Sequence, residues 1–388
     1  MALVREDSFT EVSEKSWASR LGGSLAGALV GVLLFAGSFF VLVWNEGRAV
    51  DAIVALDAGA GMVVVVPADR VDPANDGRLI HVSGPATVTA PLVDPVFKVG
   101  GDRLLRLERR VEMYQWREDK ETSTETSVGG KETTRTTYSY VTGWSEAEID
   151  SSTFRRPEGH GNPRLPYRSQ TLDARPVRLG AYTLGESQIR QIDDFEPLPA
   201  DGDAALPAGF RRDGEAIVRG TPESPQVGDL RILFQAVPAQ TVSVVARQAA
   251  GGLTAYRAAN GHVIELVRTG AHDAESMFRE AKAEEALFTW ILRAAGFLMM
   301  LVGIALLASP LTWLASVLPF LASIVGFAAF GIALIAAVPL TLLTIALSWL
   351  AFRPLIAGGL IVAAVVLTLA IRRLVPRRRS AAPAPAET

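Results

Sequence analysis

The sequence contains no cysteine, only four histidines and, from Ala294 to Phe352, no charged residue. Without cysteine there are no disulfides and no thiolate chemistry, so the fold must be held by packing. His81, His160, His262 and His272 are far apart and form no HExxH or paired motif, which argues against zinc. P-loop, G-x-S-x-G and dinucleotide-binding patterns are absent too. We therefore predict no catalytic residue, metal, cofactor or nucleic-acid partner.

The charge-free run is too long for a single membrane helix, since about 20 apolar residues span a bilayer. It must fold back, and it resumes after Arg353. We predict three connected helices at about 290–308, 323–350 and 355–371, with an interfacial turn between the first two. A further apolar segment, residues 21–43, is too long for a cleaved signal peptide and predicts a retained signal-anchor helix.

Basic residues predict the orientation of these spans. Residues 372–388 form an arginine-rich tail, and Arg5, Lys15 and Arg20 precede the first span. The positive-inside rule then places residues 1–20 and the tail in the cytoplasm. The tail could also contact anionic lipid headgroups. Residues 44–288 would form a large extracytoplasmic domain between the first and second spans, large enough to bury its own core.

Small residues mark one face of the first span. Gly23, Gly27 and Gly31 recur at four-residue spacing, which would let another helix approach closely. The alternative is that glycine is simply common in membrane helices. We expect any partner to come from the same chain, because other spans are available.

The domain between the spans is predicted to be β-rich. Its clearest strand is Arg103–Trp116, where apolar and polar residues alternate strictly from Leu105. A Thr- and Tyr-rich segment, 133–144, predicts a hairpin with that strand, joined by a polar tip at 118–132. Further strands are predicted at 61–66, 78–83, 86–90, 217–219, 230–236, 242–247 and 263–267, with a short helix at 182–192. From Asp273, an N-cap candidate, the composition predicts one helix into the second span.

One face of the hairpin would carry four aromatic side chains, Tyr114, Trp116, Tyr138 and Tyr140. A small domain rarely leaves so large an aromatic face bare. We predict that these rings are covered by the rest of the domain, by another copy or by a partner, and they form our candidate interaction surface.

The polar candidates are few. His160 and Asn162 lie in a Gly/Pro-rich loop, and Asp229 and Arg231 lie near a later strand. Loops carry function more often than cores do, yet the sequence supplies no partner for acid-base work, so a turn-stabilising role for His160 is favoured. Glu108 and Glu112 are interleaved with arginines and are better explained by a charge ladder across strands than by an acid/base pair.

Several stretches resemble the transmembrane protein 43 family, also called LUMA, over nearly the whole chain. They include Asn45–Ala49, Asn75–His81, Arg110–Trp116, Tyr138–Tyr140, Gly159–His160, Asn162–Pro163, Val227–Arg231, Val245–Gln248, Arg293–Gly296, Leu340–Thr344 and Arg353–Leu355. At Asp76 the family tends to have Glu. The block Arg-Val-Glu-Met-Tyr-Gln-Trp at 110–116 is the most specific of these matches.

The resemblance implies a four-span protein with a large lumenal domain. In animals the family is placed in the endoplasmic reticulum and inner nuclear membrane, where it self-associates and organises the envelope through emerin and lamins. The Ala, Arg and Val bias suggests a bacterial source, where the inner membrane would be the location and those partners could not be transferred. What could be shared is self-assembly and the organisation of membrane partners.

The sequence thus predicts an α+β membrane protein with four transmembrane helices, one amino-terminal and three carboxy-terminal, and a β-rich extracytoplasmic domain. We predict a non-enzymatic homo-oligomer that contacts the lipid bilayer and organises still unknown membrane or envelope proteins. The alternatives are an envelope enzyme with a site near His160 and Asp229, and a channel formed by oligomerised spans. The spans contain no internal acidic residue or histidine, which disfavours transport.

Overall fold

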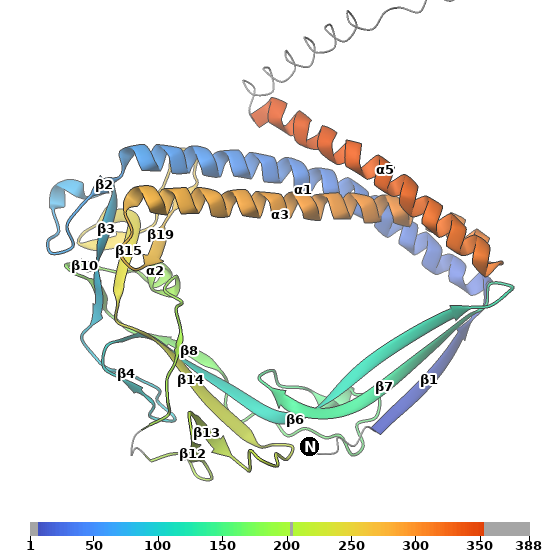
Figure 1. Cartoon of the computed structure of the whole chain (residues 1–388), viewed down its shortest axis with the longest axis horizontal. Coiled ribbons are helices and arrows are strands. Elements are labelled where there is room, and N and C mark those ends of the chain that lie inside the picture. The colour runs from blue at the N-terminus through green and yellow to red at the C-terminus, as the bar shows by residue number, and fades with distance from the viewer. Residues whose placement is uncertain (1–6, 202–204, 353–388) are drawn as a thin grey trace, which may run out of the picture. The chain divides into compact units, whose positions relative to one another are not determined.

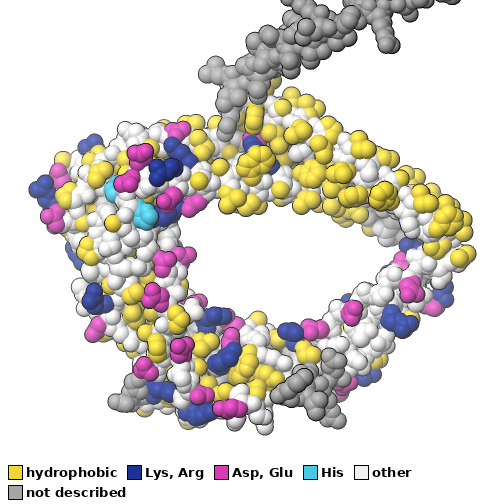
Figure 2. Space-filling view, in the orientation of Figure 1, with side chains coloured by type: hydrophobic (Ala, Val, Ile, Leu, Met, Phe, Trp, Pro, Cys, Tyr) yellow, Lys and Arg dark blue, Asp and Glu magenta, His cyan; other side chains and the backbone are white. Residues whose placement is uncertain are grey.

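The computed structural model describes residues 7–201 and 205–352 and confirms the mixed α+β class (Figure 1). The chain divides into two compact units. Of the described residues, the β-rich unit contains those up to Leu21, Ala52–Glu285 and Leu314–Ala322, and the helical unit contains Gly22–Asp51, Ala286–Trp313 and residues 323–352. Hydrophobic side chains gather over the long helices, whereas charged side chains are spread over the strands (Figure 2).

Three described helices are long and apolar enough to cross a membrane: α1 (Leu21–Met62), α3 (Ala274–Leu307) and α5 (Pro319–Phe352). A short helix, α4 (Ser309–Ala315), occupies the predicted interfacial turn. The predicted fourth span at 355–371 and the basic tail at 372–388 lie outside the described residues.

Helix α1 continues well past residue 43, where the sequence analysis ended the first span. No proline interrupts the chain between Asn45 and Met62, and the second half of the helix packs in the β-rich unit through buried Ala55 and Leu56. The strand predicted at 61–66 is therefore reduced to β2 (Val64–Val65). Tertiary packing, which a local pattern does not contain, decided the end of this helix.

Helix α3 confirms the prediction of one continuous helix from the β-rich unit into an apolar segment. Asp273 caps it, because its Oδ1 accepts a hydrogen bond of 2.8 Å from the Ser276 backbone N–H. This bond lowers the pKa of Asp273, since it stabilises the ionised carboxylate.

Helices α1 and α3 approach closely within the helical unit. A Cβ placed on Gly31 would lie 2.8 Å from the carbonyl oxygen of Gly303, and one on Gly303 would lie 2.7 Å from the backbone nitrogen of Phe35. Gly27 meets Ser309 in the same way, at 3.2 Å from its Oγ, whereas Gly23 has no neighbour within 4 Å. The partner of the glycine face thus comes from the same chain, as expected.

The larger sheet is built on β6 (Leu104–Thr126), which pairs with β7 (Glu132–Ser145) on one side and β14 (Leu230–Pro238) on the other. Its order is β1-β7-β6-β14-β13-β12, with β8 (Gln170–Asp173) on β6 and β11 (Glu196–Pro197) on β14. Strands β13 and β12 are Ala216–Arg219 and Arg211–Asp213. The alternation from Leu105 is confirmed, because Leu105, Leu107, Val111 and Met113 have no exposed area.

The hairpin is longer than predicted. Regular pairing continues to Thr126 opposite Glu132, so most of the predicted tip is strand. The turn itself uses Gly129 and Gly130, with φ of 93° and 75°. These are values that glycine adopts without strain. At Gly130 a Cβ would also lie 2.4 Å from the Trp17 ring.

The amino-terminal segment, for which no structure was predicted, forms β1 (Asp7–Lys15) and pairs antiparallel with β7, from Asp7 opposite Tyr140 to Lys15 opposite Glu132. Its residues are mostly polar or charged and its apolar–polar alternation is short, so the sequence gave little indication of a strand. The pairing places residues 7–15 in one sheet with the hairpin, whereas the charge distribution predicts the two on opposite membrane sides. Two strands cannot pair through the apolar core of a bilayer, so these placements exclude each other.

The smaller sheet has the order β19-β15-β16-β10-β9-β3-β2, with a further pairing of β15 and β3. Its strands are β3 (Leu79–Val88), β9 (Val177–Leu179), β10 (Tyr182–Thr183), β15 (Thr241–Ala249), β16 (Gly252–Thr254) and β19 (Leu266–Thr269). The two strands predicted at 78–83 and 86–90 are the single β3. The helix predicted at 182–192 is β10 followed by α2 (Glu186–Arg190), because Gly185 in extended conformation precedes the helix. Buried aliphatic side chains such as Ile80, Val82 and Val244 form the core.

Two short strand pairs complete the β-rich unit. Strand β4 (Leu92–Val93) pairs with β5 (Gly100–Gly101), and β17 (Tyr256–Arg257) pairs with β18 (Val263–Ile264). The strand predicted at 263–267 is thus divided between β18 and β19.

Candidate functional site

His160 lies between aromatic side chains at the base of the hairpin. Its ring stacks on Tyr140, with centroids 4.0 Å apart, and meets Trp116 edge to face at 4.8 Å. Its Nδ1 donates to the Arg156 carbonyl at 2.9 Å, and its Nε2 lies 3.6 Å from the Asp7 carboxylate. The side chain is only 6% exposed. These contacts fix the ring as a packing residue of its loop.

Tyr140, one of the four rings of the candidate interaction surface, has no exposed area. Its hydroxyl donates to Glu118 Oε2 at 2.9 Å and accepts the Arg156 backbone N–H at 2.9 Å. Burial raises the pKa of Tyr140, and the bond to the Glu118 carboxylate raises it further, because both disfavour the phenolate. The loop containing Phe154 and His160 thus covers part of the aromatic face from within the chain.

Asn162 binds the hairpin in place of a neighbouring strand. Its Oδ1 accepts the Trp116 N–H at 2.7 Å and its Nδ2 donates to the Trp116 carbonyl at 2.9 Å. Ser151 Oγ in turn accepts the Asn162 backbone N–H at 2.8 Å. The amide satisfies both backbone groups of Trp116 where β6 has no strand partner on that side, which is a structural role.

Asp229 holds a turn, since its Oδ2 accepts the backbone N–H groups of Thr221 and Gln226 at 3.3 and 2.9 Å. A Cβ at Gly220 would lie 2.0 Å from the Asp229 Cγ, so glycine is required there. No hydrogen bond joins Asp229 to His160 in the described parts of the chain.

Arg231 and Tyr114 belong to a second aromatic cluster on the larger sheet. Arg231 donates through Nε and Nη2 to Glu112 Oε2 at 2.8 and 2.5 Å, and its guanidinium lies 4.8 Å from the Trp144 ring centroid. The Tyr114 ring is 5.5 Å from Trp144, and its hydroxyl bonds Thr142 Oγ1 at 2.8 Å. Glu112 thus forms a cross-strand ion pair, as the charge-ladder interpretation predicted.

Tyr138 lies farther along the hairpin, where the sheet has only three strands. Its ring stacks on Phe9 of β1 at 6.5 Å between centroids, and Lys120 Nζ lies 5.9 Å from its centroid. We call this part the distal ribbon: β1, residues 117–126 of β6 and residues 132–141 of β7. Residues 119–125 and most of β1 are exposed, so beyond the buried Tyr140 this region lacks a core of its own.

The helical unit contains a charged site that the sequence analysis missed. Glu46 in α1 is fully buried and binds Arg293 of α3 through Nε and Nη2 at 2.6 and 2.9 Å. Its Oε2 also accepts the Trp349 Nε1–H of α5 at 2.8 Å. The guanidinium lies 4.7 Å from the Trp290 ring. The available signal in the sequence was a carboxylate, Glu46, shortly after an apolar run.

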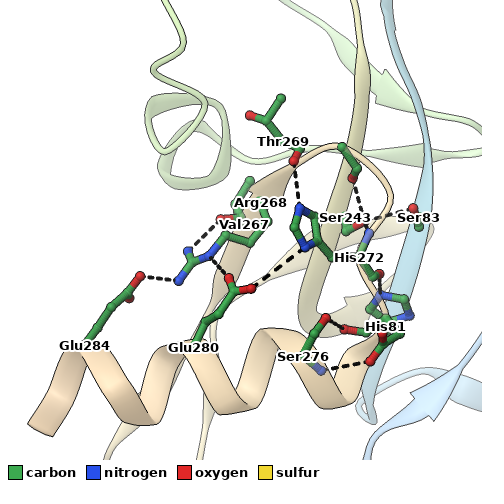
Figure 3. A network of polar contacts seen from close by, with 12 residues as sticks. His81, Ser83, Ser243, Val267, Arg268, Thr269, His272, Ser276, Glu280 and Glu284 are labelled. Atoms are coloured by element: carbon green, nitrogen blue, oxygen red, sulfur yellow. Dashed lines mark hydrogen bonds and ion pairs between the residues drawn. The ribbon is translucent and has the colours of Figure 1, made fainter.

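Another polar network fixes the first turns of α3 within the β-rich unit (Figure 3). Glu280 accepts Arg268 Nε at 3.1 Å, and Glu284 accepts Arg268 Nη2 at 2.5 Å. His272 Nε2 donates to the Thr269 carbonyl at 3.0 Å, while its Nδ1 lies 4.0 Å from Glu280. These residues tie the helix to β19 and its following loop.

His81 completes the network from β3. Its Nε2 donates to the His272 carbonyl at 2.8 Å, and Ser243 Oγ accepts the His272 backbone N–H at 2.8 Å and donates to the Ser83 Oγ at 2.8 Å. Burial lowers the pKa of His81, since it penalises the imidazolium. Within residues 7–201 and 205–352, no three His, Asp or Glu side chains form a group that could hold a metal ion.

Comparison with known proteins finds relatives that share one description. A family model described as Transmembrane protein 43 matches residues 113–354. The chain is 33% identical over 383 residues to Transmembrane protein 43 of Rattus norvegicus, with 95% of each chain covered. It is 32% identical over 380 residues to the protein of that name from Homo sapiens, covering 95% of this chain and 94% of the relative.

A more distant relative extends the same match. The chain is 31% identical over 351 residues to a Transmembrane protein 43 homolog of Drosophila melanogaster, covering 87% of this chain and 91% of the relative. No solved structure matches the chain.

Proposed function

The chain belongs to the transmembrane protein 43 family, and from this premise we propose that it is a non-enzymatic, multi-pass membrane protein that self-associates. Its β-rich unit would also hold other membrane or envelope proteins in place. The observation that carries the proposal is the distal ribbon, an extended sheet surface whose β1 and β6 residues are mostly exposed.

The distal ribbon is poorly suited to stand alone in water. Three strands are stable when at least one face packs on apolar side chains, but residues 119–125 are exposed in an unbroken run. Thr–Thr pairs on the ribbon, such as Thr10 with Thr137 at 3.1 Å and Thr124 with Thr134 at 3.3 Å, are polar. A partner surface would supply the packing that the chain itself does not.

The ribbon also ends on an open edge. Strand β1 is the last strand of the described sheet, and its outer backbone groups are free to pair with another strand. It is nine residues long and carries an exposed apolar side chain, Val12, at 53% exposure. A second copy offers an identical edge, so two β1 strands could pair antiparallel about a two-fold axis.

Charge supports this pairing. Antiparallel β1 strands centred on Glu11 would place Asp7 opposite Lys15 of the other copy. The two central Glu11 side chains would not remain uncompensated, since each is 2.6 Å from an Arg155 guanidinium. Opposite charges across strands contribute about 0.2 to 1 kcal/mol per pair.

The chemistry of the polar candidates favours binding over catalysis. His160 is stacked and hydrogen-bonded to a backbone carbonyl, and Asp229 is occupied by two backbone N–H groups. A general base needs a free nitrogen or oxygen within reach of substrate. No contact of the described residues specifically supports the enzyme or the channel alternative.

Crosslinking through β1 tests the proposal. Because the chain has no native cysteine, an introduced cysteine is the only thiol that can react. Ser13→Cys in membranes should give a dimer with a bis-maleimide that spans about 14 Å, because the two Ser13 positions would lie four residues apart along the paired strands. Ser224→Cys, in the exposed loop before β14, should not give this dimer. Val12→Lys in the Ser13→Cys background should reduce the yield, because an edge lysine opposes strand pairing.

Val263→Lys, at an exposed valine of β18 outside the larger sheet, is the matched control and should leave the yield unchanged. Equal crosslinking from Ser13 and Ser224, or no effect of Val12→Lys, would contradict self-association through this edge.

A further inference from the structure

An apolar groove of about 320 Å³ runs along the outside of the helical unit between α1 and α5. Phe39 and Val43 of α1 form one wall, and Leu343 and Leu347 of α5 form the other, with Thr344 and Ser348 between them. The groove begins beside Phe352, where the described part of α5 ends, and extends back to Leu340.

The two hydroxyl groups on the floor of the groove are already hydrogen-bonded. Thr344 Oγ1 donates to the Leu340 carbonyl at 2.7 Å and Ser348 Oγ donates to the Thr344 carbonyl at 2.8 Å. Both hydroxyls are thus satisfied within α5 and need no hydrogen bond from an occupant. The walls are substantially open, since Leu343 is 54% and Leu347 is 58% exposed in the described structure. An apolar helix or an acyl chain would fit such a surface.

The chain that follows Phe352 has the right length and connection to fill it. Only Arg353 and Pro354 separate α5 from residues 355–371, which contain no charged residue. A connection this short makes two helices antiparallel neighbours. The distance from Leu340 to Phe352 along α5 is about 18 Å at 1.5 Å per residue, which residues 355–367 of a returning helix would match.

We propose that residues 355–371 form a helix that docks in this groove and seals α1 against α5. Counting back from the turn, Ala363 and Ala364 come to the level of Leu343, where their small side chains permit close approach. The inference concerns the chain's own last apolar segment and does not rest on self-association.

Paired cysteines test the docking in the full chain, which has no native thiol. Leu343→Cys is combined in turn with cysteine at Val362, Ala363 or Ala364, because length alone leaves the rotation of the helix open. Copper-phenanthroline oxidation in membranes should link at least one pair within one chain, detected by mass spectrometry of the monomer band.

The matched control replaces Leu342, which is adjacent, 62% exposed and outside the groove. Its pairs should give at least about fourfold less intrachain link, because a disulfide needs Cβ atoms within about 4.5 Å. If Leu343→Cys disturbs folding, Leu347→Cys with cysteine at Leu360 or Ile361 probes the next turn.

Two results would overturn the proposal. Disulfide-linked dimers through the Leu343→Cys position, with no intrachain link, would show that a second copy fills the groove. Reaction of both introduced thiols with a lipid-soluble maleimide, with no link of either kind, would show that lipid fills it.

Discussion

At the scale of single residues, the surroundings of two histidines, His160 and His81, give them different roles. His160 is stacked on Tyr140, whereas His81 is buried in a polar network at the start of α3. His81 Nε2 donates to the His272 carbonyl, so in the neutral ring Nδ1 carries no hydrogen, and this buried atom has no hydrogen-bond partner in the described structure. Protonating Nδ1 would add a charge that burial opposes.

This arrangement predicts that acid destabilises the β-rich unit. Burial lowers the pKa of His81 below its ordinary value of 6.5, although the nearby Asp273 carboxylate and the His272 carbonyl act in the opposite direction. Below pH 6.5 the unfolded chain therefore protonates His81 more readily than the folded chain does. Stability is fully present above pH 6.5 and falls as the pH drops below it.

His81→Gln should flatten this dependence, because its amide can still donate to the His272 carbonyl but does not titrate. The measurement is the melting temperature of parent and variant between about pH 7.5 and about pH 5.5 in detergent, a window that brackets the ordinary histidine pKa. His272, Glu280 and Asp273 face the same network and are present in both proteins, so the difference reports His81. If the melting temperatures of parent and variant fell equally with pH, His81 would not be the cause of the acid sensitivity.

At the scale of elements, a buried charge holds the helical unit together. Glu46, Arg293 and Trp349 come from α1, α3 and α5 and meet with no water-exposed area at the carboxylate. A charge so buried is stable only when paired, since removing one partner leaves the other unpaired at a cost of about 3–5 kcal/mol.

We expect Glu46→Ala to lower the melting temperature of the detergent-solubilised protein by breaking this contact among three helices. Glu46→Ala combined with Arg293→Met should recover part of the loss, because the second change removes the unpaired cation. Glu223→Ala, at an exposed loop residue, is the control and should have little effect. A double variant no more stable than Glu46→Ala would show that the pair is not what couples the helices.

At the scale of the whole molecule, the pairing of β1 with β7 bears on membrane topology. Ser13 and Arg135 lie on these strands, with Ser13 opposite Thr134 and Val12 opposite Arg135. The sheet requires both strands on one side of the membrane, whereas the positive-inside rule places residues 1–20 opposite the hairpin.

We expect Ser13→Cys and Arg135→Cys to be labelled by an impermeant maleimide from the same side of sealed membranes. Residues 21–43 are the sole long apolar segment between the two strands, so this result would mean that α1 enters the membrane without carrying the chain across it. Ser224→Cys, elsewhere in the β-rich unit, should label with both. Labelling of Ser13→Cys from the other side would show that β1 leaves β7 in the inserted protein.

Elements with a strong local period were predictable here, and those decided by distant contacts were not. The alternation from Leu105 to Met113 and the capped helix from Asp273 are encoded in neighbouring residues, and both are confirmed. The second half of α1 and the strand β1 depend on packing against residues far away in the sequence, so no local pattern marked them. The same holds for Glu46, whose partners lie at positions 293 and 349.

The sequence by itself determined the membrane character, the mixed α+β class and the family, because apolar runs, strand alternation and specific blocks such as residues 110–116 are recognisable without knowledge of contacts. Only the tertiary structure decided that Tyr140 is buried, that His160 is stacked between aromatic rings, and that a carboxylate is held inside the helices. The physical reason is that burial and hydrogen-bond partners are properties of residues distant in sequence, which only folding brings together.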